Sequence, residues 1–228
     1  QFAERSVVYL GHLLSAEGIK PKPSLIKAIK FAPAPTSKDD VRSFMGMAEF
    51  YSRFIDNLAR KSYSLCQLLE SKVKFVWNEE YQKDFQAIKD AICEYSTVKA
   101  YNDQAKCFVT TDASIKGLGA VLNQQVVGGK WSTVAFASRS LTPAEECYSV
   151  IERESLAVVW ALEHFRTYVW GRQVVVRTDH KPLVKVLTTE GGIKASPRIA
   201  RLSMRLLDYN FEVEYVPGKA NCIADFFI

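Results

Sequence analysis

The spacing of apolar positions changes along the chain, and the first half is mostly helical. From Ser6 to Leu14 the pattern predicts a strand, a turn at Gly11 and a second strand. A strand is also predicted at Val73–Trp77. Helical spacing and capping residues predict helices over 24–31, 37–55, 65–69 and 79–92. This half is therefore expected to begin with a hairpin, which a small helical subdomain follows in the sequence.

Strands dominate the second half. β-branched and aromatic runs predict strands over 107–112, 117–124, 131–138, 173–178 and 211–215, with Gly128-Gly129 in a turn. A long helix is predicted from the capping pair Ser149 and Glu152 to Gly171, and another over 197–207. The predicted fold class is α/β, with helices covering a mixed five-stranded sheet whose first three strands are antiparallel.

Composition places the chain among ordinary globular proteins. It has 228 residues, of which 48% are hydrophobic and 24% charged. We expect no membrane partner, because no apolar run approaches the ~18 residues of a membrane helix. Five widely spaced cysteines and three histidines make a zinc site improbable and favour reduced thiols. An intracellular protein is expected, in the cytoplasm or the nucleus, and the initial Gln suggests a piece of a longer chain.

Positive charge is concentrated in one segment. Nine basic and four acidic residues lie between Lys20 and Lys61, an excess equal to the net charge of +5 for the whole chain. A local positive field favours a polyanionic partner, and a solvated helix face is an equally good explanation. The candidate phosphate contacts in this segment are Lys27, Lys30, Arg53 and Lys61.

A second group of basic residues lies near the end of the chain. In the helix predicted over 197–207, spacings of three and four put Arg198, Arg201 and Arg205 on one face. They are candidate contacts for the phosphates of a nucleic acid. A solvated amphipathic helix is the alternative.

Four acids stand in comparable settings. Asp112 and Asp179 end strands, Glu154 lies early in the long helix, and Asp225 follows the last strand. Each alone is better explained as a turn cap or a solvated residue. Together they could converge at one edge of the sheet, where crowded carboxylates repel unless cations neutralise them. Two Mg²⁺ ions, with Mn²⁺ as a substitute, would suit such a site and could cleave a phosphodiester.

Several motifs in order resemble one family. The second half closely resembles the ribonuclease H domain of gypsy-type retrotransposon Pol polyproteins, and the first half resembles the end of the polymerase palm, the thumb and the connection. The motifs are Tyr9-Leu10-Gly11-His12, Phe50-Tyr51-Ser52-Arg53-Phe54, Phe75-Val76-Trp77, Thr111-Asp112-Ala113-Ser114, Ala135-Phe136-Ala137-Ser138-Arg139, Thr178-Asp179-His180-Lys181-Pro182 and Val216-Pro217-Gly218-Lys219-Ala220-Asn221.

The resemblance implies a domain plan and an activity. A palm hairpin would occupy 1–20, a helical thumb 21–72, a connection 73–105 and a ribonuclease H-like domain 106–228. The family's metal-binding acids fall on Asp112, Glu154, Asp179 and Asp225. The implied substrate is an RNA·DNA hybrid, and the implied partners are the rest of the Pol polyprotein, with palm and fingers upstream and integrase downstream. The palm's Tyr-x-Asp-Asp motif is absent, so no polymerase activity is expected. The alternative is a domesticated or decayed fragment that binds nucleic acid without cleaving it.

Overall fold

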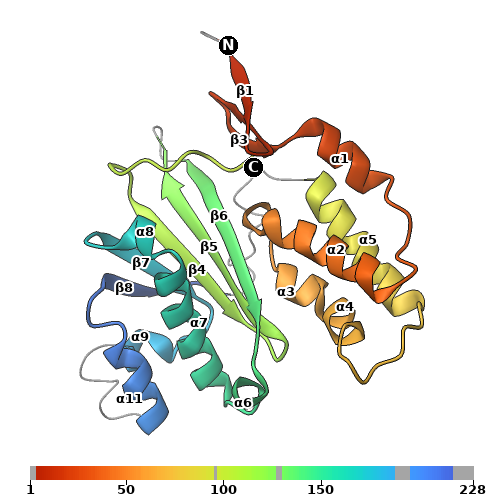
Figure 1. Ribbon diagram of the computed structural model, residues 1–228. Coiled ribbons are helices and arrows are strands. Elements are labelled where there is room, and N and C mark those ends of the chain that lie inside the picture. The colour runs from red at the N-terminus through yellow and green to blue at the C-terminus, as the bar shows by residue number, and fades with distance from the viewer. Residues whose placement is uncertain (1–3, 95–96, 127–129, 188–195, 218–228) are drawn as a thin grey trace. The chain divides into compact units, whose positions relative to one another are not determined.

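The chain forms two compact units (Figure 1). The computed structural model describes residues 4–94, 97–126, 130–187 and 196–217. One unit comprises residues 1–100 with 136–140, and the other comprises residues 101–135 with 141–228. No helix within these described ranges is both long and apolar enough to cross a bilayer.

The first unit begins with three antiparallel strands. The expected hairpin is confirmed, since β1 pairs with β2 around Leu10 and Gly11, both of which have positive φ. The third strand, β3, was missed because Pro21 suggested a boundary, yet Pro21 is tolerated as the last residue of a short strand. The elements of this unit are β1 (Ser6–Tyr9), β2 (His12–Ser15), β3 (Gly18–Pro21), α1 (Pro23–Lys30), α2 (Lys38–Phe50), a 3₁₀ turn (Ser52–Phe54), α3 (Leu58–Lys61), α4 (Tyr63–Leu68) and α5 (Glu79–Cys93).

Helix caps explain where the two longest helices of this unit begin. The side chain of Ser37 accepts a hydrogen bond from the Asp40 backbone N–H, and that of Asn78 accepts one from Tyr81. The expected helix over 37–55 is too long, because α2 ends at Phe50 and a 3₁₀ turn follows. That tighter turn keeps Phe54 and Ile55 in the core, so the apolar spacing hides the break.

The strand predicted at Val73–Trp77 is wrong. This segment belongs to no sheet among the described residues. Its aromatic residues instead pack on α5, with the Trp77 and Phe85 ring centroids 5.9 Å apart in edge-to-face geometry. Aromatic residues fit a pleated sheet and a helix surface equally well, which is why composition predicted a strand here.

The second unit contains most of a mixed five-stranded sheet with the order β6-β5-β4-β7-β8, and residues 136–140 of strand β6 belong to the first unit. β4 is antiparallel to β5 and parallel to β7, and β7 is parallel to β8. The predicted fold class is confirmed. The elements are β4 (Cys107–Ala113), β5 (Gly117–Gln125), β6 (Trp131–Ser140), α6 (Pro143–Glu146), α7 (Val150–His164), α8 (Arg166–Val169), β7 (Gln173–Thr178), α9 (Leu183–Val186), α11 (Pro197–Met204) and β8 (Asn210–Tyr215). The turn predicted at Gly128-Gly129 lies outside the described residues.

Helix α7 lies across one face of this sheet, where it packs on β4 and β5, and α11 packs against α7 (Figure 1). The predicted capping box of Ser149 and Glu152 is present. The helix ends at His164 and not at Gly171, because Phe165 leaves helical geometry and the short α8 follows. Gly171 adopts a left-handed conformation, with φ of 71°, after α8. Helix α11 likewise ends at Met204, before the predicted Leu207.

Candidate active site

Two of the predicted acids lie at the same end of neighbouring parallel strands. In β4 and β7 the register pairs Thr110 with Arg177. Two residues further along the chain come Asp112, near the end of β4, and Asp179, directly after β7, and both are exposed. Parallel pairing therefore brings these two carboxylates to one edge of the sheet, as the sequence predicted.

A tight turn fixes the chain directly after Asp112. The Ser114 backbone N–H donates to the Gly117 carbonyl oxygen over 2.9 Å. The Ser114 hydroxyl accepts hydrogen bonds from the backbone N–H groups of Lys116 and Gly117, each at 3.1 Å. The Thr111-Asp112-Ala113-Ser114 motif thus leads into the β4–β5 turn, which sets where the end of β4 presents Asp112.

Helix α7 supplies the third acid, Glu154. Its side chain belongs to the buried face of the helix, and the residue is only 5% exposed. Carboxylate oxygens of Asp112, Glu154 and Asp179 all lie within 4.8 Å of one another. A strand, a helix and a second strand therefore converge on one small site.

The electrostatics of this site are unfavourable for an ionised Glu154. Burial, and then the charges of Asp112 and Asp179, raise the pKa of its carboxyl to about 8, while Arg153 lowers it slightly. The Oε2 atom of Glu154 is buried without a hydrogen-bond partner among the described residues. A buried carboxylate oxygen without a partner is costly unless a proton or a cation satisfies it.

These residues fit a hard divalent cation. Three carboxylates offer oxygen ligands at close spacing, and the orphaned Glu154 oxygen lacks another partner among the described residues. The neighbouring His180 donates its backbone N–H to Thr178 Oγ1 over 3.1 Å, which shapes the chain around Asp179. Asp225, the fourth acid expected here, lies outside the described residues.

The three predicted arginines have different surroundings. Arg198 pairs with Glu152 over 2.9 Å, and Arg205 pairs with Glu163 over 2.5 Å, so both hold α11 and the turn after it to acids of α7. Arg201 is exposed, and its Nε donates to the Pro197 carbonyl of its own helix. The sequence did not predict these ion pairs, because they join segments far apart in the chain. Contact with phosphates stays a prediction for all three.

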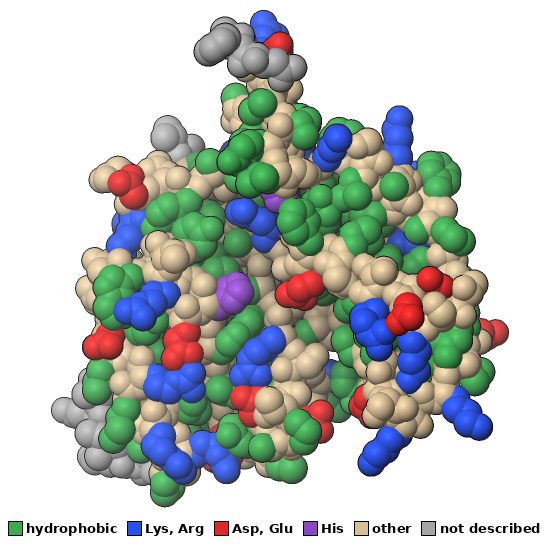
Figure 2. Space-filling view, in the orientation of Figure 1, with side chains coloured by type: hydrophobic (Ala, Val, Ile, Leu, Met, Phe, Trp, Pro, Cys, Tyr) green, Lys and Arg blue, Asp and Glu red, His purple; other side chains and the backbone are tan. Residues whose placement is uncertain are grey.

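The basic candidates of the first unit also differ. Lys27 and Lys30 are exposed in the last turn of α1. Arg53 is half-buried, with its Cζ 5.7 Å from the Phe54 ring centroid, and Lys61 donates to the Asp56 carbonyl over 2.7 Å. On the face shown in Figure 2, Lys and Arg side chains are interspersed with acids. Their role in binding stays a prediction.

The sheet order and the three acids at its edge define a ribonuclease H-like domain. Residues 102–209 match the model of the RNase H-like domain found in reverse transcriptase. The resemblance drawn from the sequence motifs is thereby confirmed.

Retrotransposon polyproteins are similar to nearly the whole chain. The Pol polyproteins of transposon 412 and transposon gypsy, both from Drosophila melanogaster, are 37% and 34% identical over 98% and 99% of the chain. The chain spans only 18% and 22% of their lengths.

Solved structures show the same fold. A foamy viral protease-reverse transcriptase in complex with an RNA/DNA hybrid gives a TM-score of 0.74 at 18% identity, covering 94% of this chain and 30% of its own. A dsDNA complex of the foamy viral enzyme gives 0.75 at 17% identity, covering 94% and 45%.

Proposed function

We propose that the chain is the ribonuclease H part of a retrotransposon reverse transcriptase and hydrolyses the RNA strand of RNA·DNA hybrids. The observation that carries the proposal is the cluster of Asp112, Glu154 and Asp179 around a buried oxygen without a partner among the described residues. The match of residues 102–209 to the model of the RNase H-like domain supports it, and so does the RNA/DNA hybrid bound by a protein of the same fold.

Asp112, Glu154 and Asp179, with Asp225 as the fourth acid, would hold two Mg²⁺ ions or, as a substitute, Mn²⁺. Bound there, such ions supply an activated water and stabilise the leaving oxygen of the phosphodiester. Asp112 and Asp179 are exposed at strand ends and so can face the substrate. Glu154 lies on the buried face of α7, which holds it in place. Its carboxyl would release its proton when a cation binds.

The proposed partners of this chain, including the polymerase, are the other parts of a longer polyprotein. We propose that palm and fingers upstream and integrase downstream complete the protein, because the chain spans about a fifth of its curated relatives. The chain contains no Tyr-x-Asp-Asp sequence, so we expect no DNA synthesis from these residues alone. Lys27, Lys30, Arg53, Lys61, Arg201 and Arg205 remain the proposed contacts for the hybrid, whereas a phosphate contact for Arg198 would have to displace its pair with Glu152.

Cleavage of a hybrid with a labelled RNA strand tests the proposal, with duplex DNA as the substrate control. The parent chain should cut the RNA strand in Mg²⁺ and not in EDTA. Asp112→Asn and Asp225→Asn should each slow cutting at least about 100-fold, the scale of losing one stabilising group in a transition state. Asp103→Asn, in an exposed turn, is the matched control.

Hybrid binding separates the two functions that the sequence left open. If the parent binds the hybrid yet cuts it in neither Mg²⁺ nor Mn²⁺, the chain is a binding fragment without nuclease activity. If Asp112→Asn cuts as fast as the parent, the acidic cluster is not the catalytic site.

A further inference from the structure

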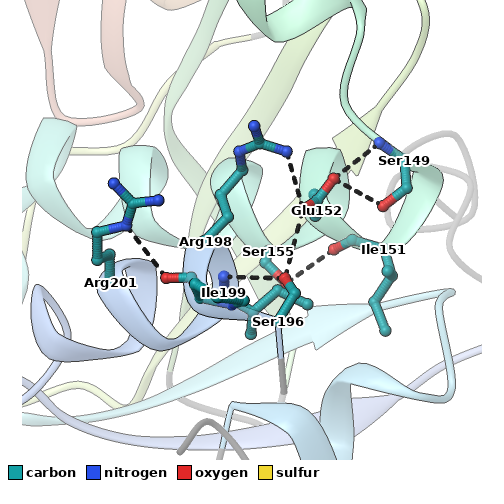
Figure 3. Close-up of polar contacts among 9 residues, drawn as sticks. Ser149, Ile151, Glu152, Ser155, Ser196, Arg198, Ile199 and Arg201 are labelled. Atoms are coloured by element: carbon teal, nitrogen blue, oxygen red, sulfur yellow. Dashed lines mark hydrogen bonds and ion pairs between the residues drawn. The ribbon is translucent and has the colours of Figure 1, made fainter.

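One carboxylate joins the start of α7 to the start of α11. Glu152 Oε2 accepts hydrogen bonds from the Ser149 backbone N–H at 3.0 Å and from its hydroxyl at 2.9 Å, which caps α7. Its other oxygen, Oε1, accepts from Arg198 Nη1 at 2.9 Å and from the Ser196 hydroxyl at 3.4 Å (Figure 3). The N-terminal turns of the two helices are therefore connected through Glu152.

Arg198 is held from a second direction. Its Cζ lies 4.0 Å from the centroid of the Tyr148 ring, just before the α7 cap. The Arg198 side chain is 43% exposed, whereas that of Glu152 is 12% exposed. A half-exposed guanidinium thus covers a largely buried carboxylate and an aromatic ring at the beginning of α7.

Glu152 and Glu154 lie on nearly opposite sides of the same helical turn, because successive residues of an α-helix are rotated by about 100°. Glu152 faces Arg198 on α11, and Glu154 faces Asp112 and Asp179. When Glu154 is ionised, as cation binding requires, repulsion from Asp112 and Asp179 favours any rotation or unwinding of this turn that moves it away from them. The Glu152–Arg198 pair opposes that movement from the other side.

We propose that Arg198 is a positioning residue: by holding Glu152, it fixes the first turn of α7 and keeps Glu154 in place to bind a divalent cation. This inference rests on the proposed function, because it concerns the acids of the same site. It assigns to Arg198 a role through Glu152 and Glu154, with no contact to the substrate.

The rival role for Arg198 is a phosphate contact. A phosphate would have to compete with the carboxylate of Glu152 and with the Tyr148 ring for the same guanidinium. Arg201 provides the matched comparison on the same helix, since it is exposed and has no ion pair within the part of the chain that the structure describes. The two roles predict opposite effects for one substitution, Glu152→Gln.

The experiment uses the full 228-residue chain, four single variants and the double variant Arg198→Met/Glu152→Gln. Arg198→Met removes the ion pair, and Arg198→Lys keeps the charge as a rescue. Glu152→Gln keeps the capping box, which accepts Gln at this position, and removes the charge that Arg198 needs. Arg201→Met is the control. Each protein is titrated with Mg²⁺ alone, following the shift of its melting temperature, and then with a labelled hybrid at several salt concentrations.

The Mg²⁺ midpoint is the Mg²⁺ concentration that gives half of the full shift in melting temperature. If Arg198 positions Glu154, Arg198→Met and Glu152→Gln should each raise this midpoint about tenfold, the scale of removing a group that supports a metal ligand. The double variant should be no worse than either single one, because both remove one interaction. Arg198→Lys should recover most of the effect, and Arg201→Met should leave the Mg²⁺ midpoint unchanged. In cleavage assays, Arg198→Met and Glu152→Gln should lower kcat with little change in KM for the hybrid.

Two results overturn the proposal. The first is an unchanged Mg²⁺ midpoint in Arg198→Met and Glu152→Gln, or no Mg²⁺-induced shift in the parent chain. The second is the pattern expected of a phosphate contact. Hybrid binding would then weaken in Arg198→Met, with the slope of log affinity against log salt concentration lower by about one, and it would tighten in Glu152→Gln. If the Mg²⁺ midpoints change as expected but the parent cuts no hybrid, the positioning role stands and the nuclease function fails.

Discussion

Glu154 on α7 and Asp112 at the end of β4 present carboxylate oxygens to each other within 4.8 Å. Glu154 is buried and Asp112 is exposed. Burial and the two neighbouring acids raise the pKa of Glu154 to about 8, so without a cation its carboxyl is mostly protonated at neutral pH. This relationship links the stability of the metal-free protein to pH.

The first prediction concerns stability against pH in EDTA. The pKa of Glu154 is 4.5 in the unfolded chain and about 8 in the folded one. Protonated Glu154 therefore contributes to the free energy of unfolding, by at most about 5 kcal/mol. This contribution is fully present below about pH 4.5 and is lost as pH rises through about 8. Urea unfolding of Glu154→Gln should therefore show a flatter pH profile than the parent and a more stable protein above pH 8.

Subtracting the two profiles isolates Glu154, because other acids contribute with the opposite sign. Glu152 is one of them: the Ser149 backbone hydrogen bond is the largest of the contacts that lower its pKa, so its contribution is lost as pH falls. Asp103→Asn, an exposed acid elsewhere, should leave the profile unchanged. Parallel profiles for Glu154→Gln and the parent would show that Glu154 is not destabilised by its surroundings.

The second prediction concerns competition between protons and Mg²⁺. Because binding must displace one proton from Glu154, the Mg²⁺ midpoint should fall up to about tenfold per pH unit from pH 6 to about 8 and level off above it. Thermal-shift titrations at four pH values measure this slope. The slope should disappear in Glu154→Gln, although its affinity is lower throughout. A slope that survives in this variant would assign the proton to another group.

Local signals in the sequence predicted much of this site. Asp112 and Asp179 follow β-branched strands, and the parallel register of β4 and β7 brings them together. Ser149 and Glu152 are three residues apart, so their capping box was readable without tertiary information. The meeting of three acids was inferred from this order of elements and from the family motifs, and the structure brings the three together.

Features that depend on long-range packing were not predictable in the same way. The pairing of Arg198 with Glu152 requires α11 to lie on α7, and spacing along α11 alone favoured one shared arginine face. The strand expected at Val73–Trp77 is replaced by aromatic packing on α5. The unpredicted ion pair and the wrong strand have the same cause, because a side-chain pattern states what a residue can contact but not which partner the fold provides.

The third prediction concerns the exposed lysines of α1. If Lys27 and Lys30 contact phosphates, replacing both with Gln should weaken hybrid binding equally for all sequences, because phosphates carry no sequence information. The slope of log affinity against log salt should fall by about one for each phosphate that is no longer neutralised. The matched control is the double replacement of Lys72 and Lys74 with Gln, which removes the same charge. Equal slopes of log affinity against log salt in both double variants would indicate that Lys27 and Lys30 face solvent and contact no phosphate.

The last prediction concerns Arg177, which lies on β7 and contacts residues of three other strands. Its Nε bonds Glu214 on β8 at 2.8 Å, and its Cζ lies 4.1 Å from the Phe108 ring of β4 and 5.4 Å from the Trp131 ring of β6. The Arg177 side chain is 18% exposed, so stacking on the rings should matter more than its pair with the half-exposed Glu214. Urea unfolding should show Arg177→Met destabilised by about 1–2 kcal/mol and Glu214→Gln by less than about 1 kcal/mol.

Arg177→Lys separates stacking from charge. Lysine keeps the charge beside Glu214 but loses the planar group that lies over Phe108 and Trp131. We therefore expect Arg177→Lys to be nearly as destabilised as Arg177→Met, with the Mg²⁺ midpoint unchanged in both. A lysine variant as stable as the parent would show that the ion pair with Glu214, and not the stacking, carries the contribution of Arg177 to the sheet.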